Sequence, residues 1–191
     1  ASNFSEKRCE IIEIITLAVE EEVSLVQLRE KNLPVRLLFE LTKEAVAITR
    51  GSATRLLVND RADIAFAANA DGVHLTANSL PAFVIRNSFP KELIIGVSTH
   101  TNEEAMNASA SDADFAVFGS IFETPDKGQP LGTADLGEVC EKVRPFPVLA
   151  LGGIEESNIS SILEAGASGF AAIRALNDPD SLRTICRKLK K

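Results

Sequence analysis

Apolar residues follow two alternating patterns along this chain. In the longer segments they recur every three or four positions, as at Cys9, Ile12, Ile15 and Val19, which indicates amphipathic helices. Between these segments lie short apolar runs bounded by charged or turn-forming residues, which indicate buried strands. We expect helices over residues 5–22 (with Ser5 as N-cap), 34–49, 62–69, 81–88, 102–110, 134–144, 157–165 and 179–189, and strands over 24–28, 55–58, 72–75, 93–97, 115–118, 147–151 and 170–173.

The order of these elements predicts an α/β fold. Helices and strands alternate without hairpin signals between the strands, so the sheet is expected to be parallel and covered by helices. Eight such pairs close a (β/α)8 TIM barrel, and this series starts on a helix with one strand too few. We therefore predict this barrel with its first β-strand missing from the chain. An open doubly wound sheet is the alternative, but nothing in the sequence marks the reversal of strand order that it requires.

Composition narrows the classes of protein that this chain can belong to. With 191 residues, 45% of them hydrophobic, it can bury one core, so we expect a single domain over residues 1–191. A net charge of -7 argues against nucleic acid as a partner. The three cysteines are far apart and lie in helical patterns, which fits neither a disulfide framework nor a metal knuckle. Since neither a membrane-spanning run nor a signal peptide is visible, we expect a cytoplasmic protein without a membrane partner. A homo-oligomer is left open.

Cationic side chains follow several of the expected strands. Lys127 lies in a loop between Pro125 and Gly128, where its ammonium group can be directed at an anion. In a barrel, catalytic groups come from the carboxyl ends of strands and the loops after them. Arg29, Lys31 and Arg174 occupy such positions too. The expected mouth of the barrel is therefore cationic although the protein is acidic, which favours a phosphorylated ligand.

Two pairs of neighbouring residues add to this candidate site. Gly152 and Gly153 follow the seventh strand of the full barrel, where backbone N–H groups commonly hold a phosphate, although a Gly-Gly pair is as often a simple turn. Asp60 beside Asn59 offers hard oxygen ligands for Mg2+. An equally good interpretation is that Asp60 caps the helix that begins near residue 62.

The two histidines also lie in or shortly after expected strands. His74 is inside the strand 72–75, where a lone histidine is more often a packing residue than a catalyst. His100 follows Ser98 and Thr99, so a neutral imidazole there can shuttle a proton or bind a ligand, or it simply neighbours the N-cap of the next helix.

Seven segments in the same order resemble the thiamin phosphate synthase and TenI superfamily. They are QLREK (27–31), VNDRADIA (58–65), ADGVHL (70–75), IGVSTHTNEEA (95–105), FGSIFETPDKG (118–128), LGGI (151–154) and EAGASGFAAI (164–173). The resemblance implies a phosphate-binding (β/α)8 barrel. It also implies the synthase reaction, in which hydroxymethylpyrimidine pyrophosphate loses pyrophosphate and the resulting cation is attacked by thiazole phosphate to give thiamin phosphate. The expected partners are thus small phosphorylated pyrimidine and thiazole substrates.

The resemblance also implies roles for individual residues. It assigns catalysis to Arg29, Lys127, Ser98 and His100, and contacts with the pyrimidine to Gln27 and His74. The pyrophosphate is expected to be bound by Arg29, Lys31, Asn59, Ser98 and Lys127, and Mg2+ by Asp60. The thiazole phosphate is expected to be bound by Thr124 and Gly153, and Gly152 and Arg174 also belong to the substrate-binding residues.

This chain departs from the family pattern at three positions. Ser79 replaces the second Mg2+ carboxylate, Asp126 adds negative charge to the phosphate loop, and Arg174 replaces a serine. We expect a weakened Mg2+ site in which Arg174 supplies part of the missing charge. Two alternatives to the synthase follow: a TenI-like thiazole tautomerase that relies on His100, and a non-catalytic barrel that binds thiamin intermediates.

Overall fold

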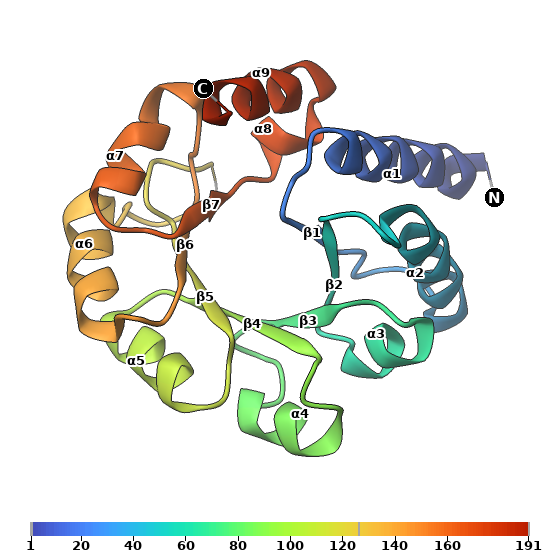
Figure 1. Ribbon diagram of the computed structural model, residues 1–191, viewed down its shortest axis with the longest axis horizontal. Helices are drawn as coiled ribbons and strands as arrows, with labels where there is room; N and C mark the ends of the chain where they lie inside the picture. Colours follow the sequence, from blue (N-terminus) through green and yellow to red (C-terminus); the bar gives the residue numbers. More distant parts are fainter. Residues whose placement is uncertain (1, 126, 191) are drawn as a thin grey trace. The chain divides into compact units, whose positions relative to one another are not determined.

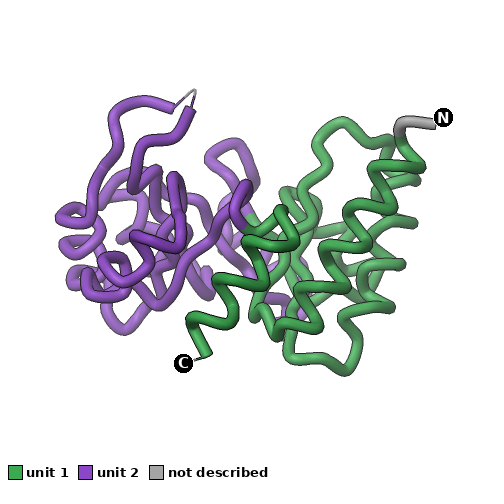
Figure 2. The backbone as a smooth tube through the Cα atoms, turned by 90° about the horizontal axis from the view of Figure 1, so that it is seen from above, with its two compact units in different colours: residues 1–74, 176–191 green, residues 75–175 purple. Residues whose placement is uncertain are grey.

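The structure is a computed structural model, shown in Figure 1, that describes residues 2–125 and 127–190. Asp126, one of the departures from the family pattern, lies outside the described residues. The chain forms two compact units, which Figure 2 distinguishes by colour. Unit 1 comprises Ala1–His74 and Leu176–Lys191, and unit 2 comprises Leu75–Ala175.

In unit 1, helices alternate with three parallel strands. The elements are α1 (Ser2–Glu20), β1 (Leu25–Leu28), α2 (Val35–Thr49), β2 (Arg55–Asn59), α3 (Ala62–Ala68), β3 (Gly72–Leu75) and, from the end of the chain, α9 (Pro179–Leu189). Leu25 of β1 pairs with Arg55 of β2, and Leu57 of β2 pairs with Gly72 of β3. The helix α1 begins at Ser2, so the prediction that Ser5 is its N-cap is wrong.

The core of unit 1 lies between its strands and its helices. Leu56 and Val58 of β2 pack with Ile15 of α1, Leu41 of α2 and Ala65 of α3, all almost fully buried. In β2 four successive side chains are buried, which is typical of a strand covered on both faces and explains why it appears in the sequence as a continuous apolar run.

In unit 2 the alternation continues with four parallel strands. The elements are α4 (Ala82–Ser88), β4 (Ile94–Thr99), α5 (Asn102–Ala110), β5 (Phe115–Gly119), α6 (Gly132–Val143), β6 (Val148–Leu151), the 3-10 turn η1 (Glu156–Asn158), α7 (Ile159–Glu164) and β7 (Gly169–Ala171), followed by α8 (Arg174–Asn177). β5 pairs with β4 on one side and with β6 on the other, and β7 pairs with β6. The helices α5, α6 and α7 cover one side of these strands (Figure 1).

All seven predicted strands occur among the described residues, with ends that differ by at most two positions. Two details of the helices were predicted wrongly. The segment 157–165 is not one helix, because the η1 turn precedes α7, and α8 was not expected at all. A helix of four residues is too short to show an apolar period, so the sequence gives no signal for it.

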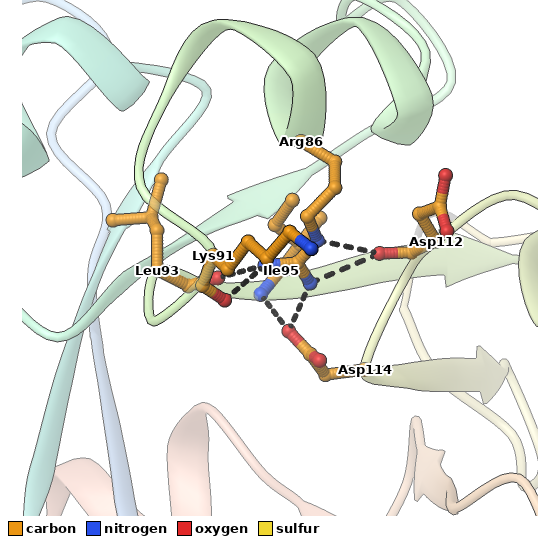
Figure 3. A network of polar contacts seen from close by, with 6 residues as sticks. All are labelled: Arg86, Lys91, Leu93, Ile95, Asp112 and Asp114. Atoms are coloured by element: carbon orange, nitrogen blue, oxygen red, sulfur yellow. Dashed lines mark hydrogen bonds and ion pairs between the residues drawn. The ribbon is translucent and has the colours of Figure 1, made fainter.

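At the amino ends of the strands, aspartates tie neighbouring strands together. In unit 2 the carboxylate of Asp114 accepts a hydrogen bond from Ile95 N at 2.6 Å, while Asp114 N donates to Ile95 O at 2.8 Å. Arg86 from α4 donates to Asp114 at 2.8 Å and to the carbonyl oxygens of Lys91, Leu93 and Asp112 (Figure 3). This network lies at the end of the strands opposite to the candidate site.

Unit 1 contains a similar but smaller network of hydrogen bonds around an aspartate. Asp71 accepts from Leu56 N at 2.8 Å and donates its own N–H to Leu56 O at 3.0 Å, with Arg55 as its ion-pair partner. In a barrel, contacts at the amino ends of strands serve stability, so we assign both networks to the fold. Among the described helices, none is long and apolar enough to cross a membrane.

Candidate functional site

In unit 1 a chain of hydrogen bonds runs along the carboxyl ends of the strands. Gln27 of β1 donates from Nε2 to Asn59 Oδ1 at 2.9 Å, and Asn59 donates from Nδ2 to Asp60 Oδ2 at 3.2 Å. An amide has one acceptor oxygen and one donor nitrogen, so the bond from Gln27 sets which end of Asn59 faces Asp60. Gln27, which was predicted separately from the pair Asn59 and Asp60, is therefore connected to that pair.

Asp60 lies just past the end of β2 in an unusual backbone conformation. Its φ is +60°, and its N–H donates to His74 O at 2.9 Å, which holds it against β3. Helix α3 has Arg61 at its N-cap position, so the alternative in which Asp60 caps this helix is wrong. An aspartate is one of the few residues besides glycine that adopt a left-handed conformation at modest cost.

His74 is buried in β3 and is a neutral imidazole at physiological pH. Only 4% of it is exposed, and burial lowers its pKa to about 4. The carboxylate of Asp60 raises the pKa of His74, and the guanidinium of Arg29 lowers it further. His74 therefore carries no charge at this pH, and its contact with a pyrimidine stays a prediction. The two cations that follow β1, Arg29 and Lys31, have exposed side chains.

The residues around Asp60 fit a Mg2+ ion only if a ligand completes its coordination. Asp60 supplies hard carboxylate oxygens, and Mg2+ is usually bound by one or two carboxylates plus phosphate oxygens and water. Among the described residues, no group of three or more His, Cys, Asp or Glu side chains could hold a metal. Ser79, at the position where the resemblance implies a second carboxylate, accepts from Thr76 N at 2.6 Å and closes a turn after β3.

In unit 2, β4 ends in Ser98 and Thr99, and His100 follows directly. The ring Nδ1 of His100 lies 2.5 Å from Gly119 O. Since a carbonyl only accepts, Nδ1 donates to Gly119 O, and in the neutral form of the ring Nε2 then presents a lone pair. The backbone N–H of His100 donates to Glu104 at 2.6 Å, next to the N-cap Thr101. The backbone of His100 thus neighbours the N-cap of α5, while a role of its ring in proton transfer stays a prediction.

The loop after β5 carries Thr124 and Lys127 and is anchored at both of its ends. Where it leaves the sheet, Ile121 N donates to Leu151 O at 2.8 Å. Where it returns, Leu131 N donates to Ser120 O at 2.9 Å. Lys127 N donates to Thr124 O at 3.2 Å, which makes a turn that leaves the lysine side chain exposed. Both ends of the loop are thus fixed by backbone hydrogen bonds, and the Lys127 cation lies between them.

The glycines after β6 allow this loop to approach closely. Gly152 has φ +100° and Gly153 has φ +63°, and Phe122 N donates to Gly152 O at 3.0 Å. A Cβ at Gly152 would lie 1.9 Å from Ser120 Oγ, and one at Gly153 would lie 2.6 Å from Glu123 O. Close packing of two loops therefore explains the Gly-Gly pair, while phosphate binding by its N–H groups stays a prediction.

Ser120 is a residue of this region that the sequence reasoning missed. Its Oγ lies 2.8 Å from Thr124 Oγ1, so two hydroxyls meet beside the glycines. A serine four residues before a threonine in a loop has no periodic pattern, so no sequence signal marks the pair. Of the other predicted residues, Ser98 lies in β4 and Arg174 begins α8 with an exposed side chain. That the residues of the two units share one ligand stays a prediction.

Several known proteins that are similar to this chain point to one family. A family model described as thiamine monophosphate synthase matches residues 3–176. A protein of Geobacter sulfurreducens is 44% identical over 175 residues, covering 90% of this chain and 82% of the relative. The thiamine-phosphate synthase of Roseiflexus castenholzii is 37% identical over 183 residues (92% and 80%), and that of Moorella thermoacetica is 37% identical over 182 residues (94% and 86%).

A solved structure supports the predicted fold. The thiamine phosphate pyrophosphorylase of Pyrococcus furiosus superposes with a TM-score of 0.82 at 32% identity, over 94% of this chain and 91% of that one. Together with the alternating helices and parallel strands, this confirms the α/β fold class of the (β/α)8-barrel type, with seven strands among the described residues.

Proposed function

Because this chain belongs to the thiamine monophosphate synthase family, we propose that it is the thiamin-biosynthetic enzyme that joins hydroxymethylpyrimidine pyrophosphate to thiazole phosphate. The observation that supports this best is the hydrogen-bonded series of Gln27, Asn59 and Asp60 beside the buried neutral His74. A pyrimidine is recognised by neutral hydrogen-bonding groups, and a pyrophosphate by fixed cations and amides. In unit 1 the guanidinium of Arg29 is close enough to His74 to lower its pKa, which supports a site that combines a cation with neutral groups.

In the proposed reaction, the bond between the pyrimidine methylene carbon and the pyrophosphate oxygen breaks, and pyrophosphate leaves with the electron pair. The thiazole nitrogen then attacks the methylene carbon and forms the new C–N bond. Such a cation forms only if the departing charge is stabilised, which preorganised positive groups do. We assign this stabilisation to Arg29, Lys31, Asn59, Ser98 and Lys127, with His100 close to the reacting groups.

We assign Mg2+ binding to Asp60, whose carboxylate is held by Asn59. The ion, when bound, neutralises charge on the phosphate oxygens. With Ser79 engaged in a turn, this chain offers one carboxylate where the family has two, so the metal is expected to bind more weakly. We further propose that both units act as one phosphate-binding domain, with Thr124, Gly152, Gly153 and Arg174 contributing to the substrate site.

One observation favours a second candidate function. The contact between His100 Nδ1 and Gly119 O leaves Nε2 as a proton acceptor, which is what a thiazole tautomerase of the TenI type needs. The tautomerase requires no pyrophosphate site, so Arg29 and Lys31 would then have no function in catalysis.

One set of assays decides between the candidates. The purified chain is given both synthase substrates with Mg2+, and then the thiazole tautomer alone. Thiamin phosphate in the first mixture supports the synthase, whereas conversion only in the second overturns it in favour of the tautomerase. Binding of the substrates without turnover in either mixture would mean a non-catalytic barrel.

Two lysines of unit 2 provide a matched pair of variants for this assay. Lys127→Ala is expected to lower kcat/KM about 10- to 100-fold, because a charged hydrogen bond to the leaving group is lost. Lys91→Ala removes a lysine with an exposed side chain in the turn before β4, and it should leave activity unchanged. Equal activity of the two variants would refute the role of Lys127.

A further inference from the structure

The hydroxyl groups of Ser120 and Thr124 lie within hydrogen-bonding distance of the same carbonyl oxygen, that of Phe122. Ser120 Oγ lies 3.2 Å from Phe122 O, Thr124 Oγ1 lies 3.1 Å from the same oxygen, and the two hydroxyls are 2.8 Å apart. The three groups therefore form a small triangle at the start of the loop that carries Lys127.

The number of protons limits how this triangle can be hydrogen-bonded. Each hydroxyl has one proton to donate, so two protons serve three contacts. Both hydroxyls can donate to Phe122 O, which has two lone pairs, or one of them donates to Phe122 O and the other donates to its neighbouring hydroxyl. When an anion accepts a hydrogen bond from Thr124, Ser120 is the hydroxyl that remains to donate to Phe122 O, whichever arrangement was present before.

We propose that Ser120 is a positioning residue for an anion bound at Thr124: it donates to the Phe122 carbonyl when Thr124 turns its hydroxyl proton to a phosphate oxygen. This rests on the proposed function, in which Thr124 binds the thiazole phosphate. The exchange matters because a carbonyl that loses its donor in a partly buried place costs free energy. Ser120 removes that cost, so the phosphate binds more tightly.

The surroundings of Ser120 keep its hydroxyl in place for this exchange. Its backbone oxygen accepts from Leu131 N at 2.9 Å. Its side chain packs on Gly152, where a Cβ would lie 1.9 Å from Ser120 Oγ and 2.7 Å from Ser120 Cα. Both the main chain and the side chain of Ser120 are therefore confined. Thr124 in turn lies on the loop that brings Lys127, a cation suited to the same anion.

The test measures the KM for each substrate separately. Ser120→Ala is expected to raise the KM for thiazole phosphate about three- to tenfold and to leave the KM for the pyrimidine pyrophosphate unchanged, since one neutral hydrogen bond is lost at one anion only. Ser109→Ala is the matched control, because Ser109 also donates to a backbone carbonyl, that of Met106, at 2.8 Å. It should change neither KM. An equal rise in both KM values for Ser120→Ala would mean a general loss of structure and would overturn the proposal.

A double-mutant cycle asks whether Ser120 acts through Thr124. Thr124→Val removes the hydroxyl at nearly constant shape, and in that background Ser120→Ala should have no further effect on the thiazole phosphate KM. An undiminished effect in the Thr124→Val background overturns the proposal. Should Ser120→Ala fail to fold, Ser120→Gly removes the same hydroxyl with less to accommodate beside Gly152.

Binding measurements separate failure of this inference from failure of the proposed function. If the wild type does not turn over the substrates, calorimetry with thiazole phosphate and with inorganic phosphate is performed on the same variants. Weaker phosphate binding by Ser120→Ala than by wild type then supports the role of Ser120 in a protein that is not a synthase. Equal binding by both proteins, or no binding by the wild type, overturns it.

Discussion

Replacing Gly152 with alanine is expected to destabilise the protein strongly, for two independent reasons. The backbone at Gly152 has φ +100°, in the left-handed region that side chains rarely adopt. In addition, a Cβ there would lie 1.9 Å from Ser120 Oγ and 2.7 Å from Ser120 Cα, so the start of the β5 loop would have to move. The structure allows the two contributions to be separated.

The magnitude follows from adding these contributions. A residue with a Cβ in a left-handed conformation costs about 1–2 kcal/mol, and forcing extra volume into a packed site costs about 1–3 kcal/mol. We therefore expect Gly152→Ala to lower the free energy of unfolding by about 2–5 kcal/mol. Since proteins of this size are stable by about 5–15 kcal/mol, the variant should fold but unfold at much lower denaturant concentration.

Two other glycines serve as controls in equilibrium unfolding with urea. Gly51 has φ +80° and no atom within 4 Å of the position that a Cβ would occupy, so Gly51→Ala reports the backbone term alone, about 1–2 kcal/mol. Gly128 has neither constraint, and Gly128→Ala should stay within about 0.5 kcal/mol of the wild type. If Gly152→Ala costs no more than Gly51→Ala, the close contact with Ser120 does not exist and the reasoning about this loop fails.

Three further predictions concern other parts of the chain. With a chelator present, the free energy of unfolding should fall by about 3 kcal/mol as pH drops from about 6.5 to about 4, because the unfolded state protonates His74 before the folded state does, and His74→Gln should flatten this dependence. Asp114→Asn should cost about 1–3 kcal/mol in urea unfolding through its lost contact with Arg86, and an unchanged midpoint would contradict this. Iodoacetamide should label exposed Cys9 well before Cys140, because burial raises the pKa of the Cys140 thiol, and equal labelling rates would refute the assigned burial.

Most of the fold could be predicted because parallel strands are buried on both faces. The runs at 72–75 and 115–118 contain hardly any charged residue, so they stand out between helices whose polar faces contact water. The predicted strand β3 has the observed bounds, Gly72–Leu75, and the helices α5 and α9 also match the prediction. The short α8 was missed because four residues carry no periodicity.

The candidate site was predicted as a list of residues but not as a set of contacts. Position at a strand end was enough to select Asn59, Asp60 and His100 from the sequence. Their partners were not visible, because Gln27 is 32 residues from Asn59 and Gly119 is 19 residues from His100. The capping role considered for Asp60 was wrong for the same reason: its backbone is held by β3, which local sequence does not reveal.

By itself, the sequence determined the order and type of the elements, the acidic balance of the chain and the family motifs, since these depend on residue types and on spacing along one dimension. Only the tertiary structure decided which side chains share hydrogen bonds: the orientation of Asn59, the tautomer of His100 and the pairing of Ser120 with Thr124. The physical reason is that hydrogen bonds require donors and acceptors within about 3 Å in a defined direction, which depends on how strands and loops pack.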